Sequence, residues 1–303
     1  MKSISMRRYS YQWITRQALQ IPIDKTRLLL FFLCINYLIV FVDVLIAHAE
    51  NRFFPSYEWI PIIFSPLAAL STIYLLLKPK SGFPKYLNIL IHSMGALIGI
   101  MGFGFHLQAV SAGDNVTYAG LISGNPVFAP LAFVALGIIG IITSLDDHPA
   151  HRKYNLTQKT RWLLLATSFW FLATALVAYF DHARTGFENL YTWFPFYVGI
   201  FAALVLFFQS YSYYERRLSV LLGVTMVISF IVGLMGFSFH LTSDLAGRGV
   251  IQWSRVFYQA PGLAPLLFCD LGLWGILVFL DPIEESSASS IDTPTAKADG
   301  ILG

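Results

Sequence analysis

The stretch "MGFGFHLQ" at residues 101–108 recurs, with two changes, as "MGFSFHLT" at residues 235–242. Each copy closes an apolar run and places a histidine after a row of small residues. The first copy lies in the first half of the chain and the second copy in the second half. This recurrence predicts that the sequence around the two copies is duplicated as well.

The composition of the 303-residue chain is that of a membrane protein, because 56% of its residues are hydrophobic and only 12% are charged. Soluble domains carry roughly a quarter charged residues. The two cysteines, Cys34 and Cys269, lie inside apolar runs, so no disulfide framework is expected. The basic residues sit in short loops rather than on one face, which excludes a nucleic-acid partner and leaves the lipid bilayer as the expected one.

Eight stretches are long and apolar enough to cross a membrane, which takes about 20 residues. They cover residues 27–47, 58–77, 86–107, 125–145, 161–180, 192–210, 218–240 and 259–280. Sixteen of the 20 Lys and Arg residues fall on the side of the N-terminus, and basic loops stay in the cytoplasm. The sequence therefore predicts a multi-pass protein of the cell (inner or plasma) membrane with both termini cytoplasmic.

The two halves match at a fixed offset, the one that separates Met101 from Met235. "KTRLLL" at residues 25–30 corresponds to "KTRWLLL" at residues 159–165, and each half reads His-x10-Trp-x-Pro, from His48 and from His182. Because four spans are an even number, both halves enter the membrane from the same side. The predicted fold is an all-α polytopic membrane protein, with eight transmembrane helices as two tandem parallel four-helix repeats.

The predicted organisation has five parts. Residues 1–24 form a cytoplasmic N-terminal segment, in which we expect a short helix on the membrane surface, or else a disordered arm. The others are a first membrane repeat (25–147), a cytoplasmic linker (148–158), a second membrane repeat (159–281) and a disordered cytoplasmic tail (282–303).

Four histidines occupy equivalent places at the outer ends of the first and third spans of each repeat: His48, His106, His182 and His240. In an up-and-down four-helix bundle the first and third helices lie on a diagonal, so one histidine from each can ligate a metal between them. Imidazole suits haem iron and transition metals. The sequence predicts two ligand pairs for haem b or a transition metal, with convergence of all four histidines on one ion as the alternative.

Small residues precede His106 and His240 at steps of three and four, which places them on one face of each helix. Gly99 and Gly102 form this face in the first repeat, and Gly233 and Gly236 form it in the second. Such a face admits either a neighbouring helix or a flat cofactor such as haem. The four glycines are therefore candidate cofactor-binding residues.

His92 stands fourteen residues before His106, close to four helical turns. This spacing resembles the haem-bearing helices of the cytochrome b family, and the resemblance covers this one helix. Cys34, not histidine, stands fourteen residues before His48. His92 is thus a candidate metal ligand, with Cys34 as a possible partner in a soft-metal site and a packed imidazole as the alternative.

Two carboxylates fall within predicted spans and have no counterpart in the other half. Asp270 lies near the centre of the eighth span, and Asp43 lies about a turn and a half before His48. A charge at such a depth is costly and marks a candidate functional group. Both are candidate catalytic or proton-carrying residues.

Three functions fit these observations. The first is a haem or metal carrier that passes electrons between a quinone or a redox partner protein and an outer acceptor. The second is a transporter that uses Asp270, Asp43 and the histidines as proton or ion sites. The third is a non-catalytic scaffold or assembly subunit, in which the repeated features serve packing.

Overall fold

The computed structural model describes most of the chain. The described residues are 7–10, 18–21, 24–49, 52–78, 82–112, 115–146, 157–212, 216–245 and 263–282.

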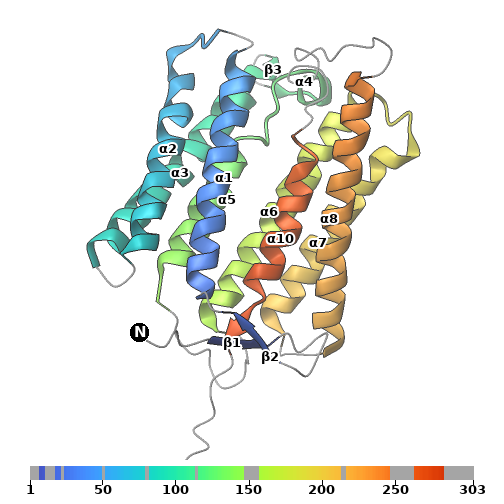
Figure 1. The fold of residues 1–303 in the computed structure, drawn as a ribbon. Coiled ribbons are helices and arrows are strands. Elements are labelled where there is room, and N and C mark those ends of the chain that lie inside the picture. Colours follow the sequence, from blue (N-terminus) through green and yellow to red (C-terminus); the bar gives the residue numbers. More distant parts are fainter. Residues whose placement is uncertain are drawn as a thin grey trace, which may run out of the picture.

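Long apolar helices dominate the described chain (Figure 1). Six are long and apolar enough to cross a membrane. They are α1 (Lys25–Ala49), α2 (Trp59–Leu77), α3 (Gly82–Ala109), α6 (Gln158–Ala183), α7 (Phe194–Tyr211) and α8 (Arg216–Leu245). One turn of 3-10 helix precedes α2 (Ser56–Glu58) and another precedes α7 (Leu190–Trp193). The prediction of a helical, multi-pass membrane protein is confirmed at this level.

Two further apolar helices are shorter than their predicted spans. Helix α5 runs over Leu131–Ser144 and α10 over Leu266–Val278, instead of residues 125–145 and 259–280. At 1.5 Å per residue they are about 21 and 20 Å long, against about 30 Å of hydrocarbon. Each begins immediately after a proline, Pro130 or Pro265. Proline lacks a backbone N–H and disfavours helix in the residue before it, so the helix begins later than the apolar run.

The helices form two groups of four, side by side in Figure 1. In the first group α1 packs on α2, α2 on α3, α3 on α5, and α5 back on α1. In the second group α6, α7, α8 and α10 pack in the same circular order. The groups meet where α5 contacts α6 and where α1 contacts α10. Consequently α1 and α3 lie on a diagonal of the first group, and α6 and α8 on a diagonal of the second.

The starts of α1 and α6 exchange hydrogen bonds. Lys25 Nζ donates to Thr160 Oγ1 at 2.6 Å, and Lys159 Nζ donates to Thr26 Oγ1 at 3.1 Å. Each lysine thus binds the threonine that follows the other lysine. This reciprocal pattern is the one that a two-fold axis produces.

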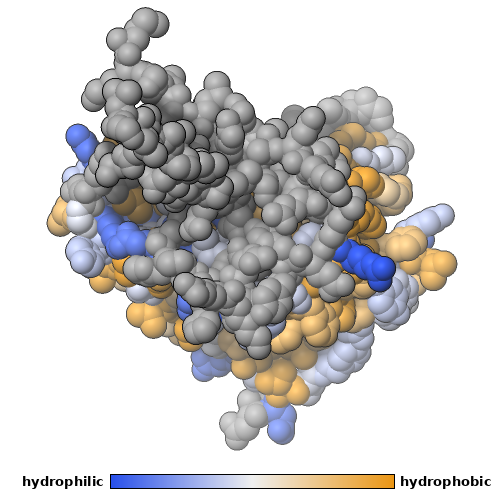
Figure 2. All heavy atoms as spheres, turned by 90° about the horizontal axis from the view of Figure 1, so that it is seen from below, coloured by the Kyte–Doolittle hydropathy of each residue, from blue (hydrophilic) through white to orange (hydrophobic). Residues whose placement is uncertain are grey.

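Apolar side chains cover the outside of the bundle as well as its interior. The view from below shows them along much of the visible flank (Figure 2). Several of the largest are more than half exposed: Phe31, Ile63, Leu70, Leu97, Phe169 and Phe208. Soluble monomers rarely expose contiguous apolar surface on this scale, so the exterior is suited to lipid.

Short strands lie at both ends of the bundle. Strands β1 (Arg7–Ser10) and β2 (Ala18–Ile21) pair antiparallel, and β1 also pairs with β5 (Asp281–Pro282). The prediction of a surface helix is wrong for residues 7–10 and 18–21, because their backbone groups bond between strands rather than along a helix. At the opposite end lie the hairpin of β3 (Ser111–Ala112) and β4 (Asn115–Val116) and the short helix α4 (Tyr118–Ser123).

The predicted segment boundaries are only partly visible. Residues 148–156 of the predicted linker and 283–303 of the predicted tail lie outside the described residues. Pro282, the first residue assigned to the tail, belongs to β5.

Candidate functional site

The structure brings the outer histidines together in two pairs. His48, near the end of α1, faces His106, near the end of α3, with ring centres 6.4 Å apart and ring planes at 81°. His182 on α6 and His240 on α8 lie 6.2 Å apart at 87°. Each pair spans a diagonal of its group, as the sequence predicts.

The protonation of His106 follows from its hydrogen bond. Its Nδ1 lies 2.9 Å from the carbonyl oxygen of Pro126. Because a carbonyl oxygen can only accept, Nδ1 carries a hydrogen, and Nε2 is the nitrogen that holds the lone pair in the neutral ring. A hydrogen bond of this kind is what fixes a ligating histidine in other metal sites. In the sequence Pro261 corresponds to Pro126, at the same offset at which Pro265 corresponds to Pro130.

The ring-centre separation of each pair is the one that two ligands on opposite sides of one metal would have if a nitrogen of each ring lay on the line between the centres. Metal–nitrogen bonds of about 2.0 to 2.1 Å, with ring centres about 1.1 Å behind the nitrogens, place two such centres about 6.3 Å apart. The observed separations are 6.4 and 6.2 Å. A tetrahedral angle at the metal would bring the centres closer together.

A bare ion finds too few ligands at either pair. Across the described ranges, no group of three or more His, Cys, Asp and Glu side chains is placed to hold a metal. The alternative in which four histidines converge on one ion therefore has no support here. A transition-metal ion at one pair would have two protein ligands, whereas tetrahedral structural sites have four. Haem supplies four nitrogens of its own and needs only the axial pair.

The candidate glycines lie against neighbouring helices. A Cβ atom added to Gly99 would lie 2.7 Å from the backbone nitrogen of Val134, and one added to Gly233 would lie 2.6 Å from that of Cys269. Gly102 and Gly236 lie in the same way against Pro130 and Pro265. These contacts correspond to the helix-packing alternative. A planar cofactor at the four glycines would require α5 and α10 to move away.

His92 is fully buried and uses both ring nitrogens for hydrogen bonds. Tyr37 Oη lies 2.9 Å from Nδ1, and Thr72 Oγ1 lies 3.4 Å from Nε2. Thr72 donates its own hydrogen to the carbonyl of Ala68, so it accepts from Nε2, and Tyr37 donates to Nδ1. Neither nitrogen of His92 keeps a free lone pair for a metal. The structure joins His92 to Tyr37, and not to Cys34.

These contacts belong to a larger polar network that joins all four helices of the first group. Asn88 on α3 donates to Ser144 Oγ on α5 at 2.8 Å and accepts from Ser71 on α2 at 3.1 Å. At the equivalent places of the second group stand apolar residues, all buried: Phe171 for Tyr37, Met226 for His92 and Leu222 for Asn88. A signal for this network exists in the sequence, since several of its polar residues have apolar counterparts in the second half.

This difference between the groups leads to a prediction. Tyr37→Phe leaves His92 Nδ1 without its donor, and His92→Met leaves the Tyr37 hydroxyl without its acceptor, so each should lower the free energy of unfolding by about 1 to 3 kcal/mol. The double variant recreates the Phe171–Met226 combination, and Gly140 lies against His92 as Gly275 lies against Met226. We expect the double variant to lower the free energy of unfolding by less than the sum of the two single variants. Unfolding of the unmodified protein, the two single variants and the double variant in detergent measures these free energies. Additive losses would contradict the expectation.

The two candidate carboxylates have different surroundings. Asp270 on α10 accepts a hydrogen bond from Asn36 Nδ2 on α1 at 3.0 Å, and its other oxygen is buried without a hydrogen-bond partner in the described chain. Asp43 is exposed on α1, and no described residue bonds to it. The structure therefore does not join Asp43 to His48. The carboxylate of Glu58, which sequence reasoning missed, lies close enough to His48 to interact with it electrostatically.

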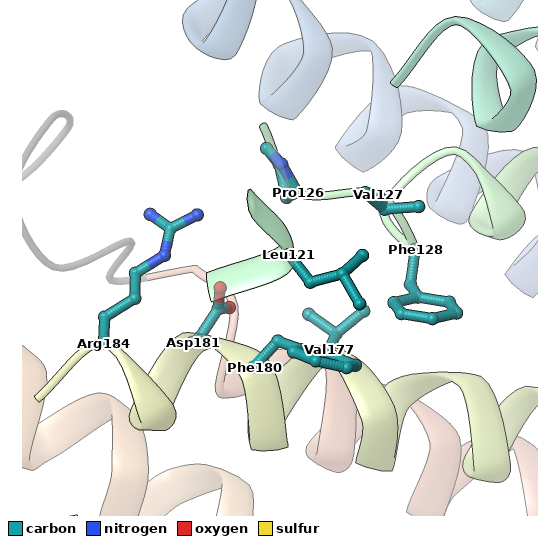
Figure 3. Close-up of a pocket in the computed structure, with 8 residues that line it drawn as sticks. All are labelled: Leu121, Pro126, Val127, Phe128, Val177, Phe180, Asp181 and Arg184. Atoms are coloured by element: carbon teal, nitrogen blue, oxygen red, sulfur yellow. The ribbon is translucent and has the colours of Figure 1, made fainter. Parts of the chain in front are cut away.

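A small hollow lies between the two pairs at the α4 end of the molecule. Figure 3 shows its lining residues, Leu121, Pro126, Val127, Phe128, Val177, Phe180, Asp181 and Arg184. Pro126 is the hydrogen-bond partner of His106, and Asp181 directly precedes His182. The rings of Phe128 and Phe180 stack across the hollow at 5.4 Å, and Arg184 donates to the carbonyl of Gly124 at 2.8 Å. The surroundings of the two pairs are thus joined through protein contacts.

No protein family, no curated protein and no solved structure matches the chain. The geometry of the two histidine pairs is therefore the basis for a function.

Proposed function

We propose that the chain is a tandem duplication of a four-helix membrane unit, with residues 25–147 and 159–281 as parallel repeats. Recurring contacts support this. The reciprocal bonds between the starts of α1 and α6, the glycine contacts with Val134 and Cys269, and the two histidine pairs all recur at equivalent positions of the two halves. In this arrangement α5 and α10, with the turns before them, complete eight crossings.

Each histidine pair would then hold one haem b, the first between His48 and His106 and the second between His182 and His240. The ring-centre separations of 6.4 and 6.2 Å carry this proposal, because they equal the spacing of two imidazoles on opposite sides of one iron. Haem iron supplies one-electron transfer. The protein's own contribution is to hold the imidazoles level with each other and, through the Pro126 carbonyl, to aim one lone pair.

The distribution of basic residues gives this carrier a direction. With the Lys- and Arg-rich loops in the cytoplasm, the histidine pairs lie toward the outer face of a cell membrane. Electrons then enter from a quinone in the bilayer or from a redox partner protein, and leave to an acceptor on the outer side. The hollow beside Pro126 and Asp181 lies at that face, next to both pairs.

A visible spectrum of detergent-purified protein, expressed with sufficient haem, tests the proposal. We expect a Soret band, sharp reduced α and β bands, and two haems per chain by the pyridine haemochrome assay. Iron analysis should give the same stoichiometry. A folded, monodisperse preparation without colour or iron would overturn the haem assignment.

A further inference from the structure

Asp270 occupies an unusual place, at the contact between the two helix groups. Helix α10 packs against α8 and α6 of its own group and against α1 of the other. Asn36, on α1, is only 4% exposed. Its side-chain amide nitrogen donates to the Phe32 carbonyl at 3.1 Å and to Asp270 Oδ1 at 3.0 Å. One carboxyl oxygen is therefore fixed in position by a neighbouring group.

The second oxygen, Oδ2, is buried and has no hydrogen-bond partner among the described residues. No Lys, Arg or His of the described chain forms an ion pair with Asp270. An ionised carboxylate in the membrane interior is costly, and one neutral amide compensates only part of that cost. Binding of a proton to Oδ2 removes this cost, because the protonated carboxyl group carries no charge.

The helices that pack against Asp270 contain few other groups that could bind a proton. Between residues 162 and 178 of α6 and between 218 and 239 of α8 the sequence contains no ionisable side chain apart from hydroxyls. On α1 the nearest titratable groups are Cys34 and Tyr37, and Tyr37 is bonded to His92. On α10 it is Cys269, whose thiol donates to the Phe230 carbonyl at 3.2 Å. Asp270 is thus the acidic group at this contact.

We propose that Asp270 and Asn36 form a proton-binding site: Oδ2 of Asp270 carries the proton, and Asn36 holds Oδ1. The site exists once per chain. When the two halves are aligned, Trp170 corresponds to Asn36 and Ala135 corresponds to Asp270, so the equivalent contact of α5 with α6 has neither group.

The location of Asn36 suggests what the proton does, and this part rests on the proposed function. Asn36 lies twelve residues before His48 on α1, about 18 Å along the helix. An electron arriving at the first histidine pair makes protonation of a carboxylate in the same low-dielectric interior more favourable. Reduction should therefore increase the fraction of Asp270 that is protonated.

Infrared spectroscopy of the reconstituted full-length protein tests the site itself. We expect a carbonyl-stretch band of a protonated carboxylic acid that shifts in D₂O, disappears in Asp270→Asn and moves in frequency in Asn36→Ala. Asp43→Asn, which removes the other candidate carboxyl, should leave the band unchanged. The absence of such a band from the difference between the spectra of the unmodified protein and Asp270→Asn at acidic pH would overturn the proposal. The D₂O measurement on unmodified protein needs no variant to fold.

The redox link has a separate readout. The oxidised-minus-reduced infrared difference spectrum should contain the Asp270 band and lose it in Asp270→Asn. If the protein binds no haem, this spectrum disappears while the static band remains, and only the proposed function fails. If haem is present but the difference spectrum lacks the Asp270 band, the link between proton and electron is refuted.

Discussion

If each histidine pair holds a haem as proposed, His106→Ala should reduce the haem content from two per chain to one. The substitution removes one of the two axial nitrogens at the first pair, and a single imidazole from His48 cannot hold a low-spin haem in the same way. The second pair, His182 with His240, lies in the other helix group and should keep its haem. The pyridine haemochrome assay, normalised to protein, measures this change.

Matched variants make the result specific. His240→Ala should also leave one haem, and the combination of His106→Ala with His240→Ala should leave none. His148→Ala, which removes a histidine in the predicted cytoplasmic linker, should leave two. Two haems per chain in His106→Ala would show that the first pair is not the ligand set. The near-perpendicular ring planes, 81° and 87°, also predict a strongly anisotropic low-spin ferric signal in electron paramagnetic resonance.

Gly99→Ala should destabilise the fold, while Gly104→Ala on the same helix should not. A Cβ at Gly99 would lie 2.7 Å from the Val134 backbone nitrogen, and backbone cannot rotate away, so α3 and α5 must separate. Overpacking of this kind costs about 1 to 3 kcal/mol. A Cβ at Gly104 meets nothing within 4 Å. There the substitution should be neutral or gain up to about 1 kcal/mol from helix propensity.

Thermal unfolding in detergent, followed by circular dichroism, distinguishes the two outcomes. Gly233→Ala provides an independent copy of the experiment, because its Cβ would lie 2.6 Å from the Cys269 backbone nitrogen. Equal melting temperatures for Gly99→Ala and Gly104→Ala would mean that α3 and α5 do not pack as closely as described. A loss of haem without a loss of stability would instead favour the flat-cofactor role of these glycines.

The long helices and the pairing of the histidines could be predicted because both follow from periodicity and position. An apolar run long enough to cross the bilayer has few structural solutions in a membrane. His48 and His106 fall at the same level on diagonal helices, so their meeting follows from the topology. The lengths of α5 and α10 were overestimated, because each helix begins only after Pro130 or Pro265, within a run that is apolar throughout. Hydropathy alone does not register that delay.

The contacts of single residues were harder to predict from the sequence. The spacing of His92 from His106 indicated a ligand, yet the structure gives both its nitrogens to Tyr37 and Thr72. Which side chain lies opposite another across a bundle depends on helix rotation, which a sequence fixes only within tens of degrees. The β1–β2 pairing was missed for a different reason. Such short strands cannot show an alternating pattern, and β5, the other partner of β1, lies far along the chain, after α10.

The exchanged bonds between Lys25, Thr26, Lys159 and Thr160 have a consequence for how such a protein can evolve. Two separate copies of one half would offer each other the same ammonium and hydroxyl groups and would associate as a symmetric homodimer. A mutation changes both subunits of a homodimer, so a carboxyl introduced at one contact between them would appear at both contacts. If the chain arose by the proposed duplication, joining the two halves in a single polypeptide removed that obligation. The contact of α1 with α10 is then free to acquire Asp270 and Asn36, while the contact of α5 with α6 remains apolar at the equivalent positions.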